Sequence, residues 1–171
     1  MLIGKLVTLR PVQRAAITGY LKWFNDTEVT KYLDIHFPMT EMSGIKDIEA
    51  LGTSTETTYI PFIIEIVDGQ KSLPIGRIDL YDLNHKDHSA SVRIIIGEKQ
   101  YWNKGYGTEA AGLIIKFGFE QVNLHRISSS VMSINERSIR MHTKVGFRQE
   151  GIRREALYKN GAYHDEVIFG L

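Results

Sequence analysis

Residues 93–121 read RIIIGEKQYWNKGYGTEAAGLIIKFGFEQ, and this stretch decides the fold. It is typical of an apolar strand, then a loop with two glycines and a lysine, and then an amphipathic helix. Backbone N–H groups in such a loop, backed by a helix N-terminus, form an anion site suited to phosphates. Gly105 and Gly107 carry no Cβ, so the backbone can approach a ligand closely there. The stretch therefore predicts a phosphate-binding loop.

The segments before this loop predict one strand, then helices, then three strands. Thr40 is a good N-cap, and Gly52 is expected to end the helix that Thr40 begins. Asp68-Gly69 is a strong hairpin signal. The expected elements are a strand at Leu6–Arg10, helices at Gln13–Phe24, Glu28–Leu33 and Glu41–Leu51, and strands at Pro61–Val67, Pro74–Leu83 and Ala90–Ile96.

The segments after the loop predict two helices and three strands. Thr108 is the expected N-cap of the first helix, while Asn135 is expected to cap the second and Gly146 to follow its end. The resulting mixture of strand pairs and helices predicts a mixed α/β layer, with residues 1–171 as a single domain. The expected elements are a strand at His125–Met132, a helix at Glu136–Val145 and strands at Phe147–Tyr158 and Ala162–Leu171, joined by a turn at Asn160-Gly161.

Composition excludes several classes of function. The net charge of +1 argues against a general binder of nucleic acid or acidic membranes. The chain has no cysteine, so it has no disulfide, thiolate metal site or cysteine nucleophile. No apolar run approaches the length of a membrane span, and the N-terminus lacks a continuous apolar segment. We therefore expect a cytoplasmic protein.

Charge is unevenly distributed along the chain. Residues 25–58 hold seven acidic residues against two lysines, and residues 136–160 hold seven basic residues against three acidic ones. Solvated helix faces would explain both runs. A cationic substrate near the acidic run and an anionic cofactor near the basic run would also explain them.

Several phosphate or metal motifs can be compared with the chain. GYGTEA fits the dinucleotide pattern G-x-G-x-x-A, but residues 98–104 separate it from its strand and no acidic residue ends the next strand. The Gly-Lys-Ser/Thr of a P-loop is absent, and a plain glycine turn before a core helix is a further alternative. The run His85–His88 (HKDH) lies in a predicted turn without a clear third ligand, so we expect no metal site.

Several segments together resemble the GNAT superfamily of acetyl-CoA-dependent N-acetyltransferases. These are LVTLRPV, WFNDTEVTKYL, WNKGYGTEA, NLHRISSSV, NERSIRMHTKVGF and GFRQEGIRREALYKNGAYHDEVIFGL, which span almost the whole chain. They are most similar to the RimJ/RimL-type branch, close to the spermidine acetyltransferases. The resemblance implies a mostly antiparallel central sheet flanked by helices, in which the fourth and fifth strands splay apart around the cofactor. It also implies a homodimer.

The resemblance implies a site for acetyl-CoA. Backbone N–H groups of the glycine loop would bind its pyrophosphate, and Trp102 takes the position where many members have Gln or Arg. The strand before the loop would pair with the pantetheine arm, and the start of the last helix would lie beside that arm. The implied cofactor residues are Ile94, Ile95, Ile96, Trp102, Asn103, Lys104, Gly105, Tyr106, Gly107, Thr108, Asn135 and Ser138.

The resemblance implies fewer catalytic residues than cofactor residues, because two of the family's usual catalytic positions hold other residue types. The backbone near Ile95 would stabilise the oxyanion, and His142 stands where the family usually has a tyrosine acid. Ser91 stands where the branch often carries a glutamate base, and serine cannot take that role. Glu65, Asp79 and the acids of residues 25–58 are alternative bases. Because cysteine is absent, a cysteinyl acyl-enzyme is impossible, and direct attack of the amine within a ternary complex is favoured.

Three functions remain open from sequence. A peptide or protein N-terminal α-amine follows from the RimJ/RimL resemblance and is favoured. A polyamine or other small cationic amine follows from the acidic run at residues 25–58. A non-catalytic acetyl-CoA sensor follows from the departures at Ser91 and His142.

Overall fold

The computed structural model describes residues 1–33, 35, 38–53, 58–68 and 71–171. Eight strands, four α-helices and two short 3₁₀ segments make up this part of the chain. They run in the order β1 (Leu2–Ile3), β2 (Thr8–Pro11), η1 (Arg14–Ala16), α1 (Ile17–Phe24), α2 (Glu41–Thr53), β3 (Tyr59–Asp68), β4 (Lys71–Asn84), β5 (Ser89–Ile96), η2 (Lys99–Tyr101), α3 (Tyr106–Glu120), β6 (Arg126–Met132), α4 (Glu136–Lys144), β7 (Arg148–Lys159) and β8 (Ala162–Gly170).

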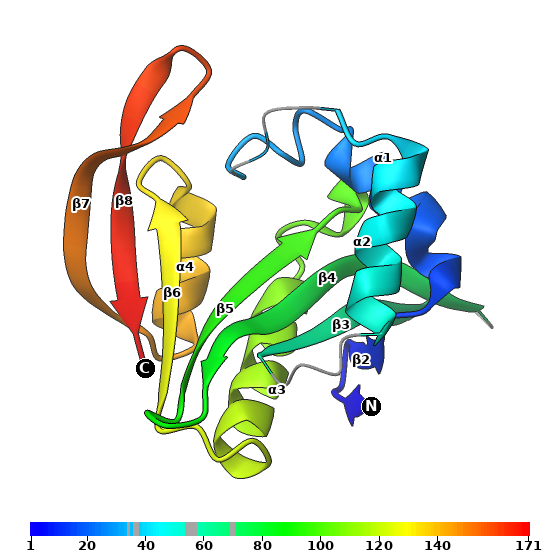
Figure 1. Ribbon diagram of the computed structural model, residues 1–171, viewed down its shortest axis with the longest axis horizontal. Helices are drawn as coiled ribbons and strands as arrows, with labels where there is room; N and C mark the ends of the chain where they lie inside the picture. The colour runs from blue at the N-terminus through cyan, green and yellow to red at the C-terminus, as the bar shows by residue number, and fades with distance from the viewer. Residues whose placement is uncertain (34, 36–37, 54–57, 69–70) are drawn as a thin grey trace.

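The strands form one sheet in the order β1-β2-β3-β4-β5-β6-β8-β7. Every neighbouring pair is antiparallel except β5 and β6, which are parallel and pair only from Ser89 to Ser91 with Arg126 to Ser128. Beyond Ser91 the two strands diverge, and Figure 1 shows β6, β7 and β8 leaning away from β5 toward the top of the view. The expected splay of two central strands is therefore present.

Strand alternation sends apolar side chains to both faces of the sheet. On one face Ile64 of β3 joins the main core with Ala110 and Ile114 of α3. On the other face the neighbouring Ile63 packs with Tyr20 of α1 and Ile48 of α2. The sheet is thus covered by helices on both sides, which is why its central strands read as continuous apolar runs.

Most predicted elements are present, with changes at their ends. The first helix begins as a 3₁₀ turn, and residues 28–33 form turns, so the short helix predicted there was wrong. The short β1 was not predicted. Helix α2 begins after Thr40, whose Oγ1 accepts from Ser43 N at 3.2 Å, but it continues through Gly52 to Thr53. The hairpin between β3 and β4 pairs Asp68 with Lys71, and its predicted turn residue Gly69 lies outside the described residues.

Candidate functional site

A cavity of about 350 Å³ opens where β5 leaves β6. The last residues of β5 form one wall, the glycine loop and the start of α3 form the second, and α4 forms the third. Eleven of the twelve predicted cofactor residues line it, and Lys104 does not; its ammonium group lies 5.6 Å from the centre of the Tyr101 ring. The predicted members in the lining are Ile94, Ile95, Ile96, Trp102, Asn103, Gly105, Tyr106, Gly107, Thr108, Asn135 and Ser138.

The start of α3 provides backbone donors to this cavity. The helix begins at Tyr106, with Gly105 as N-cap at a φ of 89°, so the predicted cap at Thr108 was wrong. Residues that carry a Cβ rarely adopt this left-handed backbone conformation, which explains why the position is a glycine. No described side chain caps the helix. The N–H groups of its first turn therefore remain available to an anion, and the helix dipole favours negative charge there.

Helix α4 adds positive charge on the opposite wall. Arg137, Arg140 and Lys144 all line the cavity. Their spacing of three and then four residues puts them on one face of the helix. The Arg137 guanidinium lies 4.0 Å from the centre of the Trp102 ring. The sequence analysis named none of these three as site residues, although the basic run at residues 136–160 contained the signal.

The donor set of this cavity fits a pyrophosphate-containing cofactor. Uncapped N–H groups and three cationic side chains converge on it, and such groups bind phosphate oxygens well. Asn135 holds the start of α4 in place, because its Oδ1 accepts from Ser138 N at 3.2 Å. The predicted cap at Asn135 is confirmed, and it also positions Ser138 in the wall.

The backbone of β5 presents alternate residues to the cavity. Ile95 pairs with Arg77 of β4, and its carbonyl oxygen lies so close to Gly76 that a Cβ there would collide with it. Because neighbouring residues in a strand point their N–H and C=O groups to opposite edges, Ile94 and Ile96 face the open edge. Trp102 Nε1 donates to the Ile96 carbonyl at 2.7 Å, in agreement with this register. The backbone of Ile95, predicted to contact the oxyanion, therefore faces β4, whereas the N–H of Ile94 faces the open edge.

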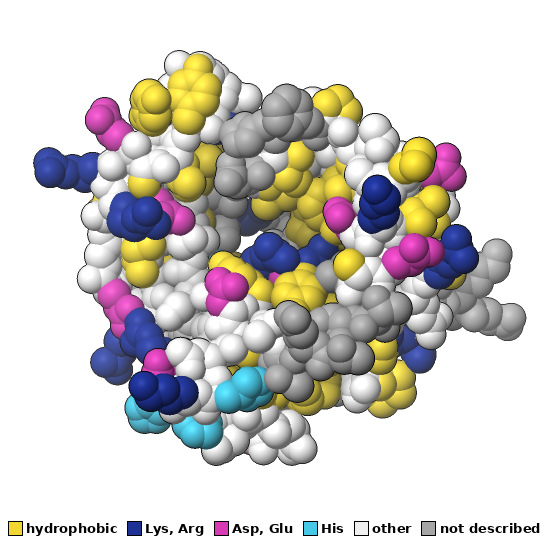
Figure 2. Space-filling view, in the orientation of Figure 1, with side chains coloured by type: hydrophobic (Ala, Val, Ile, Leu, Met, Phe, Trp, Pro, Cys, Tyr) yellow, Lys and Arg dark blue, Asp and Glu magenta, His cyan; other side chains and the backbone are white. Residues whose placement is uncertain are grey.

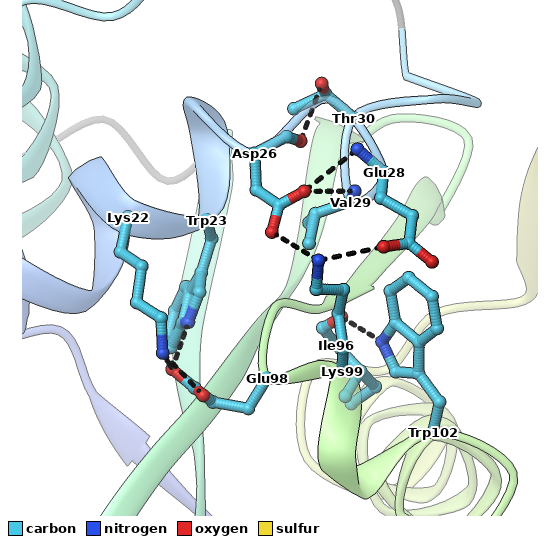
Figure 3. Close-up of polar contacts among 10 residues, drawn as sticks. All are labelled: Lys22, Trp23, Asp26, Glu28, Val29, Thr30, Ile96, Glu98, Lys99 and Trp102. Carbon is cyan, nitrogen blue, oxygen red and sulfur yellow. Dashed lines mark hydrogen bonds and ion pairs between the residues drawn. The ribbon is translucent and has the colours of Figure 1, made fainter.

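Ion pairs connect the turn that contains Asp26 and Glu28 to Lys99, just after β5 (Figure 3). Lys99 Nζ lies 2.9 Å from Asp26 Oδ2 and 2.8 Å from Glu28 Oε2. Lys99 donates hydrogen bonds to Glu28 and Asp26, which raise the pKa of Lys99 to about 12, and its bond to Asp26 lowers the pKa of that carboxylate. Trp23 Nε1 and Lys22 Nζ donate to Glu98 on the adjacent loop. We call the contact of Lys99 with Asp26 and Glu28 the latch.

The latch positions apolar residues at the cavity. Val29, Tyr32 and Leu33 follow it directly and line the cavity opposite α4. Two of the acids in the acidic run are therefore engaged by Lys99, and a third, Glu49, lies 3.5 Å from Arg14. Asp34 and Glu56 lie outside the described residues. Of the acids of this run that the structure describes, Asp47 lines the second cavity described below, so a cationic substrate stays an alternative.

A second cavity of about 670 Å³ lies on the other side of β5, between the sheet and helices α1 and α2. It shares Leu33, Ile94 and Ile95 with the first cavity. Figure 2 shows a hollow in the face of the molecule with cationic side chains at its floor. The charged residues in the lining are Asp47, Arg77, Asp79 and Arg93.

Neither strand carboxylate is a free general base. Asp79 lines the second cavity, but Arg77 Nε donates to its Oδ1 at 2.8 Å and Arg93 Nε to its Oδ2 at 2.5 Å. Burial raises the pKa of Asp79, and the two guanidinium groups act in the opposite direction. Glu65 lines neither cavity, because it pairs with Arg10 at 2.7 Å and accepts from Ser72. Ser91 lines neither cavity and bonds to Tyr81.

His142 is buried behind the first cavity and does not line it. Its Nδ1 lies 2.8 Å from the Ser138 carbonyl, and its Nε2 lies 2.8 Å from Ser129 Oγ. Burial lowers the pKa of His142, which favours the neutral ring, and Nδ1 faces the Ser138 carbonyl, which only accepts. Ser129 Oγ donates to the Val92 carbonyl at 3.1 Å, so both ring nitrogens of His142 contact buried protein groups and neither faces the cavity. The geometry does not support the predicted role of His142 as an acid.

Metal and membrane features are not seen in the described part of the chain. No three His, Cys, Asp or Glu side chains among the described residues are grouped to hold a metal ion. In the HKDH run, His88 Nδ1 lies 3.1 Å from the Asn123 carbonyl. None of the described helices has both the length and the apolar character needed to cross a membrane.

Known proteins are similar to this chain in sequence. Residues 7–148 match the family described as Acetyltransferase (GNAT) domain. The SPbeta prophage-derived uncharacterized N-acetyltransferase YokL of Bacillus subtilis (strain 168) is 27% identical over 98% of this chain and 90% of that protein. The spermidine N(1)-acetyltransferase of Escherichia coli (strain K12) is 29% identical over 94% of this chain and 83% of its own.

A solved structure has the same fold. It is the spermidine N-acetyltransferase from Vibrio cholerae in complex with CoA and spermine. It superposes with a TM-score of 0.88 at 21% identity, covering 98% of this chain and 96% of that one.

Proposed function

Because this chain belongs to the GNAT acetyltransferase family, whose members take their acetyl group from acetyl-CoA, we propose that it acetylates a primary amine by direct attack in a ternary complex. The observation that carries this proposal is that the two cavities share Ile94 and Ile95. One cavity has the donor set for a pyrophosphate, and the other reaches the same two residues from the opposite side. An acetyl donor and an amine acceptor can therefore meet at this point of β5.

The residues of the first cavity would hold and orient the donor. Arg137, Arg140, Lys144 and the first turn of α3 would bind the phosphates. The backbone of Ile94 and Ile96 would pair with the pantetheine amides, and the Ile94 N–H would stabilise negative charge on the thioester oxygen. Bound acetyl-CoA supplies the thioester that the amine attacks. Holding both reactants in place supplies much of the rate, because it removes the entropy cost of their encounter.

The two strand carboxylates that the structure describes, Asp79 and Glu65, are both paired with arginines, and this favours an α-amine as the acceptor. An α-amine has a pKa near ~8, so keeping it neutral at pH 7 costs only about 1–1.5 kcal/mol. A lysine-like amine has a pKa near ~10.4, and its deprotonation costs about 4–5 kcal/mol. In the second cavity both oxygens of Asp79 accept from arginines. A peptide or other α-amine therefore needs less help than a polyamine does.

Two other functions remain as alternatives. A polyamine acceptor is favoured by the relatives named for spermidine acetylation. A non-catalytic acetyl-CoA sensor is favoured by Ser91 and His142, since neither provides the chemistry of the usual residue. The resemblance further leads us to infer RimJ/RimL-type membership, a cytoplasmic location and a homodimer. Light scattering of the purified protein tests the dimer.

Release of coenzyme A tests the proposed function. A thiol reagent at about pH 8 would detect it with acetyl-CoA and peptides with free Ser, Ala or Met N-termini, amino acids, aryl amines and spermidine. The protein has no cysteine and adds no thiol background. Amine-dependent release is expected, with α-amines faster than spermidine. Tight acetyl-CoA binding without release on any amine would contradict the enzyme and favour the sensor.

A further inference from the structure

The floor of the second cavity is a cluster of two arginines, one aspartate and two tyrosines. Arg77 and Asp79 come from β4, Arg93 from β5, Tyr59 from β3 and Tyr20 from α1. Three adjacent strands bring these side chains together. Asp79 pairs with Arg93 across β4 and β5, and Arg77 pairs with Ile63 across β4 and β3. All five line the cavity. We call them the floor cluster.

Arg77 and Asp79 use their hydrogen-bonding groups on other members of the cluster. Both are buried. Arg77 donates from Nε to Asp79, from Nη1 to Tyr20 Oη at 2.5 Å and from Nη2 to Tyr59 Oη. Asp79 is bound by both arginines. Arg77 and Asp79 therefore position the side chains of Tyr59 and Arg93.

Arg93 is different, because it lines the cavity and has N–H groups that are not used within the cluster. Its side chain is 55% exposed. Of its five N–H groups, one donates to Asp79 and one to Tyr59 Oη at 2.9 Å. The other three have no partner among the residues that the structure describes. The guanidinium lies 4.8 Å from the centre of the Tyr81 ring and 5.6 Å from that of the Tyr59 ring.

The charge of the floor cluster is positive. Two guanidinium groups face one carboxylate, and the only other charged side chain in the described lining is Asp47 on α2. A polyamine entering this cavity would meet the Arg93 cation. An anionic oxygen group would meet the free donors of Arg93 and the hydroxyl of Tyr59, which already accepts from both arginines and so turns its own hydrogen outward.

We propose that the acceptor is a compact amine that also carries a carboxylate, and that Arg93 and Tyr59 bind this carboxylate. Arg93 is the direct neighbour of Ile94, where the amine must attack, and one residue along a strand rises only about 3.3 Å. The amine and carboxylate are therefore separated by a short spacer. A free amino acid and a peptide with an acidic residue next to its N-terminus both have this chemistry. The inference rests on the proposed function.

Matched acceptor pairs test the inference. The first pair is phenylalanine and phenylalaninamide, and the second is Ala-Glu-Ala-amide and Ala-Gln-Ala-amide. For each, kcat/KM is measured by coenzyme A release and divided by the neutral fraction of the amine. In at least one pair we expect the carboxylate member to be preferred about tenfold to a hundredfold, the usual range for a hydrogen-bonded charge. The pair that shows the preference identifies the source of the carboxylate.

Variants assign the preference to the floor cluster. In Arg93→Gln we expect the ratio to fall to about one, whereas Arg93→Lys keeps part of it. Arg154→Gln is the control, since Arg154 is an exposed arginine of β7 outside both cavities. Because Arg93 supports the buried Asp79, unchanged acetyl-CoA affinity and melting temperature must show that Arg93→Gln is folded. Tyr59→Phe, which keeps both arginines, should lower the same ratio severalfold and serves if Arg93→Gln does not fold.

The outcomes separate this inference from the proposed function. Amine-dependent release without a carboxylate preference in either pair would overturn the inference and leave the acetyltransferase standing. A preference that persists in folded Arg93→Gln and in Tyr59→Phe would overturn the role of the floor cluster. Absence of release with every amine, while acetyl-CoA binds, would overturn the proposed function and this inference with it.

Discussion

Gly105 shows how a single residue can determine the anion site. Its φ of 89° turns the chain so that α3 starts at Tyr106 without a side-chain cap. A Cβ at Gly105 would meet only Leu6, at 3.7 Å, so space is available and the constraint is conformational. Asparagine and glycine tolerate this region, but most other residues are strained in it.

Gly105→Asp is expected to weaken acetyl-CoA binding by at least tenfold. The substitution combines backbone strain with a negative charge where the phosphates would bind. Gly105→Ala separates the two effects, because it adds the strain without the charge and should weaken binding less. Isothermal titration calorimetry measures both affinities. Equal affinity of Gly105→Asp and the unmodified protein would show that this loop does not bind the phosphates.

His142 is expected to affect stability rather than turnover. Burial lowers its pKa below the ordinary value of 6.5, so the unfolded chain binds more protons below that pH. The stability from the neutral ring is fully present above about pH 6.5 and decreases as the pH falls through it. The ring stacks on Phe169, with 5.2 Å between the ring centres, so His142→Phe can keep this packing.

The melting temperature of the unmodified protein should therefore fall more between pH 8 and pH 5 than that of His142→Phe. Thermal unfolding followed by circular dichroism measures both. At pH 8, kcat should change less than about tenfold, below the usual range for loss of a proton donor. A loss of a hundredfold or more in a folded variant would restore His142 as the acid.

At the scale of elements, the latch joins the turns after α1 to the segment before the glycine loop. Lys99 lies on η2, and its two acids precede Val29, Tyr32 and Leu33. Exposed ion pairs add little to global stability, usually about 0–1 kcal/mol. The effect of the latch should therefore appear in the position of the cavity wall.

Lys99→Met is expected to raise KM for acetyl-CoA and for the amine severalfold, because Leu33 borders both cavities. The melting temperature should change little. Lys116→Met is the control, since Lys116 forms an exposed pair with Glu120 on α3, away from both cavities. Steady-state kinetics measures the change. The idea of a latch fails if the two variants have the same KM values.

Element order and the cofactor loop could be predicted because their signals are local in sequence. Glycine spacing marks the loop, and the 3.6-residue period marks α3 and α4. The start of α3 was missed because Thr108 is a better cap by type, whereas Gly105 sets the start through its φ. The floor cluster could not be predicted, since Arg77 and Arg93 meet at Asp79 only through the register of β4 and β5.

At the scale of the whole molecule, the divergence of β5 and β6 creates a passage through the sheet. Their pairing ends at Ser91, so the last five residues of β5 have an open edge. The core continues on both sides of this opening through Val92 and Ile127. A ligand that fills the opening would join two parts of the sheet that otherwise meet at only three residue pairs.

Acetyl-CoA should therefore stabilise the protein as one unit. At a concentration of about 100 times Kd, binding to the folded state alone adds about 2.7 kcal/mol. For a chain of this size that corresponds to a rise in melting temperature of roughly 5–10 °C. Differential scanning calorimetry should show one transition that shifts, and Gly105→Asp should lose most of the shift. Two transitions would contradict the prediction that residues 1–171 form a single domain.

The chain contains two tryptophans, and the fold separates their surroundings. Trp102 borders the first cavity beneath the Arg137 guanidinium, whereas Trp23 is 1% exposed and packs against Gly97. The fluorescence of Trp102 should change when phosphates draw the Arg137 guanidinium away from the Trp102 ring, whereas the fluorescence of Trp23 should stay constant. The protein thus carries an intrinsic fluorescent probe of acetyl-CoA binding, and in Trp23→Phe the tryptophan fluorescence would come from Trp102 alone.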